Sequence, residues 1–128
     1  MNEIILDSNI LLRHFLQDIP QQSRHATEFI ASIEKGEKIG YLSILVINEV
    51  IWILKKFYQI ERKQYLPQLL TLLHLPSLKC LEIKKETLIV ILEKMKQREI
   101  DFTDVYLFEI AGNRKIASFD HDFEKLRK

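Results

Sequence analysis

The chain alternates short apolar segments with longer segments whose apolar residues recur at helical spacing. Short segments at 3–7, 38–42, 79–83 and 115–119 predict strands, and the stretches between them predict helices at 8–17, 20–35, 44–57, 61–74 and 85–98. A further helix is predicted to start near Asp101 or Thr103 and to end at Gly112, with a final helical turn or two at 120–127. Strands that alternate with helices are typical of an α/β domain with a mostly parallel central sheet flanked by helices.

The length of 128 residues suits one domain with a proper hydrophobic core, which we expect to span 1–128. Only three glycines and three prolines occur, so little of the chain is left for long loops. Two of these residues mark helix boundaries, because Pro20 favours the start of the second predicted helix and Gly36 favours its end.

The formal net charge of +1 excludes the global positive field of a highly basic nucleic-acid binder. A polyanion would have to be held by local lysine and arginine clusters together with a metal ion. Cys80 is the only cysteine, which excludes an intramolecular disulfide and a cysteine-based zinc site. The longest apolar stretch contains Asn48 and Glu49 and is shorter than the roughly 20 residues of a membrane span. The N-terminus has no signal-peptide pattern, so we expect a cytoplasmic protein.

Four carboxylates lie inside apolar segments or at their ends, where carboxylates are unusual. Burying one unpaired carboxylate costs several kcal/mol, so repeated burial implies a compensating cation. A divalent metal meets this need, because hard cations such as Mg²⁺ prefer carboxylate oxygens. Sites in parallel sheets form beyond the carboxyl ends of the strands, which is where two of these acids are predicted to lie. The four are Asp7 after 4–6, Glu49 within 44–54, Asp104 before 105–108 and Asp120 after 116–119.

Each acid also has a purely structural explanation, which the sequence leaves open. Asp7 is compatible with a helix cap, and Glu49 with an exposed polar strip along its helix. Asp104, three residues after Asp101, fits a capping arrangement that is favourable to the helix dipole. Asp120 lies in a polar cluster that fits a surface turn. Together, however, the four acids repeat one arrangement, so we favour a shared metal site.

His121 lies between two acids, where a zinc ligand is one interpretation and a surface histidine is the commoner one. The other three histidines have no metal-like spacing to one another. The sequence contains no Walker loop, no GxGxxG and no GxSxG, so nucleotide-binding and serine-hydrolase functions have no support.

Four segments resemble the motifs of PIN-domain ribonucleases and occur in the order of that family. Each motif is short, but the ordered set is more specific, and the resemblance covers essentially the whole chain. The segments are 5–13 (ILDSNILLR), 46–54 (VINEVIWIL), 101–107 (DFTDVYL) and 118–123 (SFDHDF).

The resemblance implies a site for Mg²⁺ or Mn²⁺. We expect Asp7 and Asp104 to be the direct ligands, and Glu49 and Asp120 to complete the site or to act through metal-bound water. His121 departs from the pattern, because arginine or lysine is more frequent there. The implied catalytic residues and metal ligands are Asp7, Glu49, Asp104 and Asp120, supported by the polar companions Asn9 and Ser118 and by the secondary acids Asp101 and Asp122.

In its small, single-domain size the chain further resembles the VapC-like toxins of bacterial toxin–antitoxin pairs. That resemblance implies RNA cleavage, a homodimer and inhibition by a small antitoxin protein. Our hypothesis is a metal-dependent endoribonuclease in which a metal-activated water attacks the RNA phosphodiester. Candidate contacts to RNA phosphates are Arg13, Arg24, Lys55 and Lys56, although such residues are most often solvated helix ends.

Two rival functions come from other classes. A catalytically silent PIN-like module would bind only RNA or a protein partner, and the presence of all four acids argues against it. An aspartyl-phosphate phosphatase would require a second aspartate two residues after Asp7, where this chain has Asn9.

Overall fold

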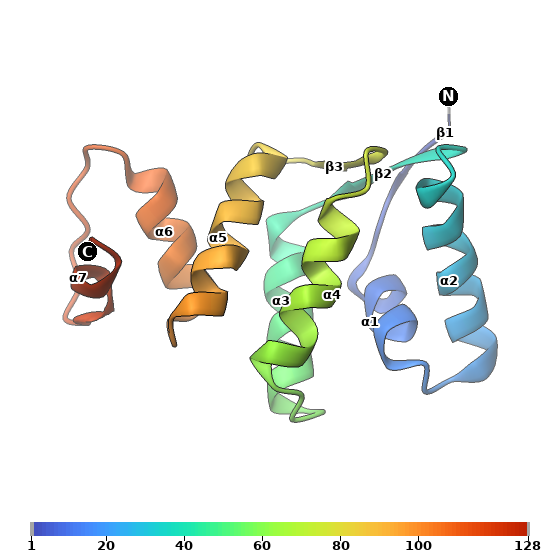
Figure 1. Cartoon of the computed structure of the whole chain (residues 1–128), viewed down its shortest axis with the longest axis horizontal. Coiled ribbons are helices and arrows are strands. Elements are labelled where there is room, and N and C mark those ends of the chain that lie inside the picture. Colours follow the sequence, from blue (N-terminus) through green and yellow to red (C-terminus); the bar gives the residue numbers. More distant parts are fainter. Residues whose placement is uncertain (1, 128) are drawn as a thin grey trace. The chain divides into compact units, whose positions relative to one another are not determined.

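The computed structural model describes residues 2–127, in which three strands and seven helices follow one another along the chain (Figure 1). The chain divides into two compact units, Met1–Lys85 and Glu86–Lys128, which we call the N-terminal unit and the C-terminal unit. The elements are β1 (Asn2–Ile5), α1 (Ser8–Leu16), α2 (Pro20–Glu34), β2 (Lys38–Leu42), α3 (Ile44–Lys56), α4 (Arg62–Leu73), β3 (Leu78–Cys80), α5 (Lys85–Gln97), α6 (Phe102–Ala111) and α7 (Asp122–Leu126).

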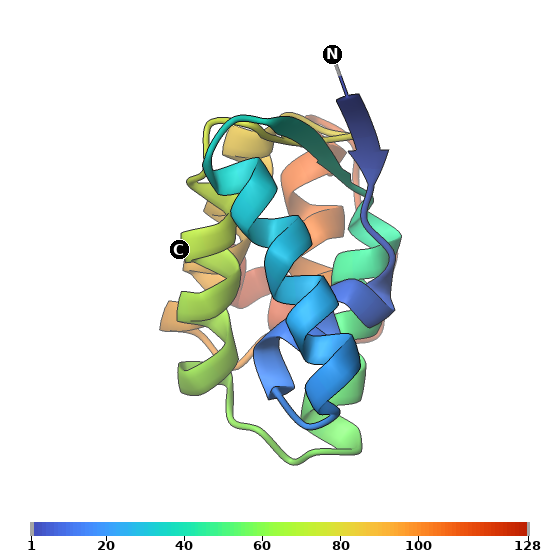
Figure 2. The same cartoon turned by 90° about the vertical axis from the view of Figure 1, so that its right-hand side faces the viewer.

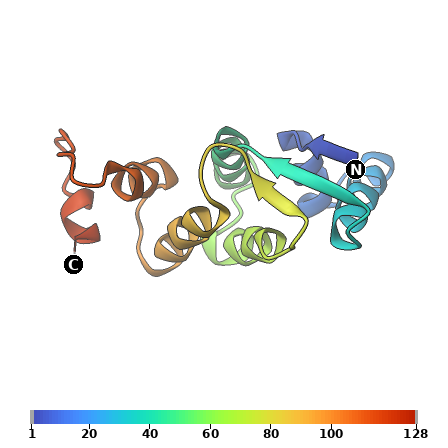
Figure 3. The ribbon, with the colours of Figure 1, turned by 90° about the horizontal axis from the view of Figure 1, so that it is seen from above.

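The N-terminal unit contains a sheet with the strand order β1-β2-β3 (Figure 3). Both strand pairs are parallel; Ile5 pairs with Tyr41, and Gly40 pairs with Leu78. Parallel strands need long crossover connections, which the helices between them supply here. The prediction of an α/β fold with a parallel sheet is therefore confirmed.

Gly40 in β2 allows close packing between the sheet and α2. A Cβ atom at this position would lie 2.5 Å from Cδ1 of Ile33 in α2 and 3.1 Å from Cδ1 of Leu78 in β3. Ile33 and Leu78 are both almost fully buried. The close approach thus depends on the missing side chain of Gly40, and it holds α2 over the sheet.

The first turn of α3 is held by side chains from two parts of the chain. Ser43 is the N-cap residue, and its hydroxyl accepts a hydrogen bond from the Leu45 N–H at 3.1 Å. The same hydroxyl donates to Oε2 of Glu82 at 2.5 Å, and the Ile44 N–H donates to Oε1 of Glu82 at 2.9 Å. Glu82 follows β3, so this contact ties the end of β3 to the start of α3.

Leucine and isoleucine side chains form most of the core of the N-terminal unit. They come from one face of each helix and from the strands, as helical and strand periodicity predicted. Fully buried members are Leu6, Leu11, Ile33, Leu42, Ile47, Leu54, Leu66, Leu69, Leu73 and Leu78.

In the C-terminal unit, side-chain contacts to other side chains and to the backbone link its three helices. Lys94 of α5 forms an ion pair with Glu109 of α6 and lies over the ring of Phe108 at 4.9 Å from the centroid. Arg98 donates a hydrogen bond to the carbonyl of Lys125, which ties the end of α5 to α7. Across residues 2–127, no helix combines the length and apolar character needed to cross a membrane.

The predicted strand at 115–119 is not formed. Residues 115–119 have no assigned helix or strand, and the Phe119 side chain is fully exposed. A strand is stable only when a neighbour completes its hydrogen-bond ladder. The described residues of the C-terminal unit are otherwise helices and turns, so this segment has no strand there to pair with. The other predicted elements form, with boundaries that differ by at most three residues.

Candidate metal centre

Three aspartates of the C-terminal unit come together in space. Asp104 lies in the first turn of α6, Asp120 lies in the segment before α7, and Asp122 is the first residue of α7. One carboxylate oxygen from each lies within 4.8 Å of the other two. Asp104 and Asp122 are half-buried, whereas Asp120 is exposed.

Local hydrogen bonds shape the segment that carries Asp120 and Asp122. The Asp120 N–H donates to Oγ of Ser118 at 2.9 Å, and the Asp122 N–H donates to Oδ1 of Asp120 at 3.0 Å. These short-range bonds are typical of serine and aspartate in turns. Ser118 was predicted to be a polar companion of the acids, and its hydroxyl oxygen accepts a hydrogen bond from the backbone N–H of Asp120. It therefore acts on the turn that presents the acids.

The electrostatic environment of the cluster is most evident at Asp104. Burial raises the pKa of the Asp104 carboxyl, and the negative charges of Asp120, Asp101 and Asp122 raise it further. Lys125 balances part of this charge, because its Nζ atom lies 3.3 Å from Oδ1 of Asp122. The ionised form of Asp104 is disfavoured at this position, so a cation that binds there would stabilise the folded protein.

The donor set suits a hard divalent cation. Mg²⁺ binds oxygen ligands at about 2.0–2.1 Å, so two oxygens on one ion are at most about 4.2 Å apart. The carboxylate oxygens of the three aspartates lie within 4.8 Å of one another, which is close to that limit. Small side-chain adjustments would therefore allow all three to bind one Mg²⁺ or Mn²⁺.

The other two predicted catalytic acids belong to the N-terminal unit. Asp7 is the N-cap residue of α1, but its side chain makes no capping hydrogen bond. The capping explanation for Asp7 therefore finds no support, and the carboxylate is left exposed beside the exposed Asn9. Glu49 lies on α3 and is also exposed.

The expectation that these acids are buried is wrong for three of them. Asp7, Glu49 and Asp120 are exposed, and only Asp104 is half-buried. The apolar run around Glu49 is not uniformly buried, because Leu45 and Trp52 on the same helix are 73% and 53% exposed. A run of apolar residues in sequence can thus cover two helix faces, of which only one faces the core.

The two remaining polar candidates near the cluster differ in role. Asp101 is the exposed N-cap residue of α6 and acts on Asp104 through its charge. His121 does not join the three aspartates, and its Nδ1 atom lies 3.8 Å from Oε2 of Glu124. The zinc interpretation of His121 finds no support. Asp122 was predicted only as a secondary acid, but it is a full member of the cluster. The sequence signal that could have identified it is the Asp-His-Asp pattern at 120–122.

The family described as "PIN domain" matches residues 4–128. The chain belongs to the PIN-domain family. No curated protein and no solved structure matches it. PIN domains generally have a nuclease-type fold and typically use a divalent metal, and the cluster of Asp104, Asp120 and Asp122 agrees with that use.

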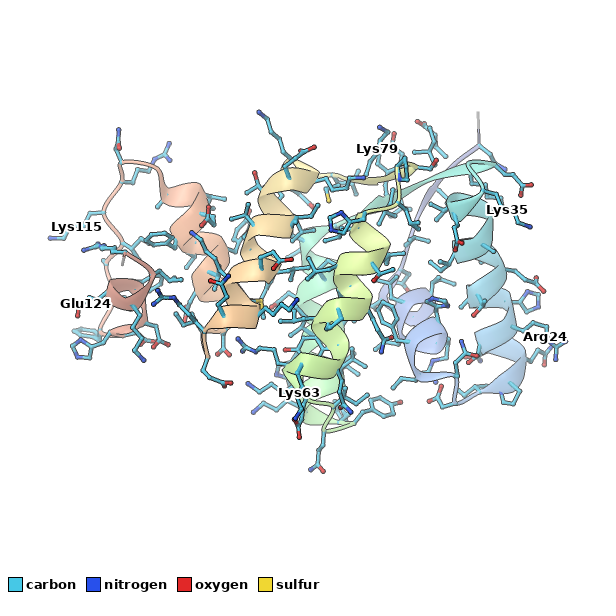
Figure 4. All side chains as sticks on the ribbon, in the orientation of Figure 1. Arg24, Lys35, Lys63, Lys79, Lys115 and Glu124 are labelled. Atoms are coloured by element: carbon cyan, nitrogen blue, oxygen red, sulfur yellow. The ribbon has the colours of Figure 1, made fainter. Side chains whose placement is uncertain are left out.

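The basic residues predicted to contact RNA occupy different environments in this PIN domain. Arg24 projects outward from α2 (Figure 4), and Lys55 and Lys56 are exposed in the last turn of α3. Arg13 differs, because its Nη1 atom donates to both carboxylate oxygens of Asp18 at 2.9 Å. Phosphate binding by Arg13 would compete with this bidentate ion pair.

Proposed function

We propose that this PIN-domain protein is a metal-dependent endoribonuclease. The proposal is supported chiefly by the convergence of Asp104, Asp120 and Asp122 within 4.8 Å, in a chain that belongs to a family of nuclease-type domains. Asp7 and Glu49 are included in the proposed catalytic set only because of the sequence motifs that contain them.

The aspartates would hold Mg²⁺ or Mn²⁺ through their carboxylate oxygens, and Ser118 would keep the turn in the geometry that presents Asp120. A divalent metal at such a site supplies a nucleophilic water at neutral pH and neutralises charge that develops on the phosphate. Asp104 disfavours its own ionised form, so a bound cation relieves repulsion that the metal-free site contains.

The net charge of the chain is only +1, so exposed lysine and arginine side chains would have to hold the RNA. Arg24, Lys55 and Lys56 are exposed and suit contacts to phosphate oxygens. Arg13 would contribute only after releasing Asp18, which makes it the weakest of the four candidates.

The biological role we propose is that of a toxin in a toxin–antitoxin pair, acting in the cytoplasm as a homodimer that a small antitoxin protein inhibits. This part of the proposal is supported by the intact set of motif acids and by the resemblance of the motif segments to those of PIN-domain ribonucleases. A short neighbouring gene for a DNA-binding antitoxin would favour it over a housekeeping nuclease.

The products of RNA cleavage provide the decisive experiment. A hydrolysis of this type leaves a 5′-phosphate on one fragment and a free 3′-OH on the other, whereas attack by the ribose 2′-OH leaves a cyclic phosphate. We expect mass spectrometry to find the former ends, with activity lost in EDTA and restored by Mg²⁺ or Mn²⁺. Cyclic phosphate ends, or full cleavage in EDTA, would refute the mechanism.

Two variants separate the nuclease from a catalytically silent module. Asp104→Asn should reduce cleavage by about 100-fold or more while weak RNA binding persists, because loss of a key catalytic group commonly costs this much. Glu99→Gln removes an equal charge from an exposed position of the same unit outside the cluster, and its cleavage should equal that of the unmodified protein. RNA binding without cleavage by the metal-loaded unmodified protein would favour the silent module.

A further inference from the structure

The N-terminal unit contains a half-open cavity of about 160 Å³ among α1, α2 and α4. Its walls include the apolar side chains of Phe15, Ile30 and Leu72. Apolar protein cavities of about 150 Å³ accommodate a benzene ring. The cavity is thus large enough for one small ring, and none of the proposed catalytic acids lines it.

A hydrogen-bond network fixes one polar wall of the cavity. Nδ1 of His14 lies 3.0 Å from the Thr27 hydroxyl oxygen, and both residues line the cavity. Nε2 of Gln17 donates to the same hydroxyl oxygen at 3.1 Å and to the His14 carbonyl at 2.7 Å. The imidazole is therefore held in one orientation before any ligand arrives. Burial lowers the pKa of His14, although the charge of Glu34 opposes this, so the neutral ring is favoured.

The negative charge of the cavity comes from Glu34, the last residue of α2. The carboxyl end of a helix carries a partial negative charge, so an acid there reinforces the potential. The last turn of α2 contains no basic residue, and Lys35, which follows it at the upper end of α2 in Figure 4, does not line the cavity. On the α4 side, the Lys85 ammonium donates to the carbonyl of Leu75 at 2.9 Å.

We propose that this cavity binds a planar organic cation, namely an amidinium or guanidinium group carried on a small ring or short apolar stem. The apolar walls suit the ring or stem, and the Glu34 carboxylate suits the N–H donors of the cation. The ring of Phe15, whose centroid lies 5.5 Å from that of His14, adds an aromatic face that attracts cations. A bare metal ion would find too few oxygen ligands on these walls. Figure 2 shows α1, α2 and α4 from the side of α2.

Benzamidine is the probe that tests the proposal on the full chain. Its ring matches the cavity, and benzamide is a neutral molecule of nearly the same shape. We expect calorimetry or ligand-observed NMR to show benzamidine binding at least about tenfold more tightly than benzamide, because the charge-assisted contact to Glu34 is lost in benzamide. Equal affinity for the two probes would overturn the proposal, as would no binding of benzamidine at millimolar concentration.

Three variants test the residues that carry the argument. Glu34→Gln should weaken benzamidine binding by about tenfold, whereas Glu28→Gln, on the same helix but outside the cavity, should leave it unchanged. Ala31→Leu should fill the cavity and abolish binding. Thermal melts would verify that each variant is folded, and unchanged affinity in folded Glu34→Gln or Ala31→Leu would refute the site.

The natural source of the cation is either a free small molecule or an arginine side chain of a partner protein. Agmatine and a blocked arginine-containing peptide carry the same guanidinium group, so their relative affinities distinguish the two sources. RNA cleavage by Glu34→Gln should equal that of the unmodified protein, so a failure of the cavity proposal is separable from a failure of the nuclease proposal.

Discussion

Carboxylates in this chain differ in role because their surroundings differ. Asp104 is half-buried among other acids, and the resulting repulsion raises its pKa. Asp18 instead forms a bidentate ion pair with Arg13, and Asp7 makes no capping bond. The same side-chain chemistry therefore yields a cluster suited to a cation, a structural ion pair and an exposed carboxylate that does not cap its helix.

At the residue scale, we predict that Asp104→Asn stabilises the metal-free protein. The folded-state pKa of Asp104 is raised, so its favourable contribution exists at low pH and is lost as the pH rises through the folded-state value. Removing the charge at neutral pH should raise the melting temperature in EDTA by about 2 °C, since partly exposed charges contribute well under about 1 kcal/mol.

The same variant should also lose the stabilisation by Mn²⁺ that binding to the native state produces. Glu99→Gln serves as the control with an equal change of charge outside the cluster. A full Mn²⁺ shift in Asp104→Asn would show that the cluster does not hold the metal.

Individual elements of the N-terminal unit depend on contacts that are remote in sequence. The first turn of α3 is satisfied by its own Ser43 and also by Glu82, which follows β3. Burial alone would raise the pKa of Glu82, but hydrogen bonds from the Ser43 hydroxyl and the Ile44 N–H outweigh it and lower the pKa. A negative charge at a helix N-terminus also favours the helix dipole.

At the element scale, we predict that Glu82→Gln lowers the free energy of unfolding by about 1 kcal/mol at neutral pH, because hydrogen bonds to a charged carboxylate are stronger than those to a neutral amide. Because the folded-state pKa of Glu82 is lowered, its contribution is present above the unfolded-state pKa and is lost as the pH falls. The difference between the variant and the unmodified protein should therefore shrink in acid.

Urea unfolding at neutral and acidic pH would measure this difference. Glu37→Gln, an exposed acid in the turn before β2, should unfold like the unmodified protein at both values. A Glu82→Gln defect that persists unchanged in acid would contradict the charge-assisted cap.

For the whole molecule, the PIN-domain match covers both units, and the motif acids are divided between them. Asp7 and Glu49 lie in the N-terminal unit, whereas Asp104 and Asp120 lie in the C-terminal unit. The proposed activity therefore requires residues from both units.

On this scale, we predict that expression of the chain in bacteria arrests growth, because cleavage of cellular RNA stops protein synthesis. Asp7→Asn and Asp104→Asn, one from each unit, should each remove the arrest at equal expression, as growth curves would measure. Normal growth of cells with abundant soluble protein that cleaves RNA in vitro would exclude the toxin role.

The sequence by itself determined the order and type of nearly all elements and the family motifs. These depend on periodicity, caps and turn residues within a few positions, such as Ser43 at the start of α3 and Pro20 at the start of α2. The pattern also predicted Asp104 and Asp120 as site residues; the structure brings both into one cluster with Asp122, and their catalytic role stays a prediction.

Only the tertiary structure decided which of these local preferences were realised. Residues 115–119 have strand-like composition, but the described part of the C-terminal unit offers no strand to complete a ladder with them, and Glu49 follows an apolar run yet lies on an exposed helix face. The ion pair of Arg13 with Asp18 and the cap that Glu82 provides for α3 depend on how the chain brings these groups together. Burial, strand pairing and charge pairing all require a partner in space, and the local sequence does not specify that partner.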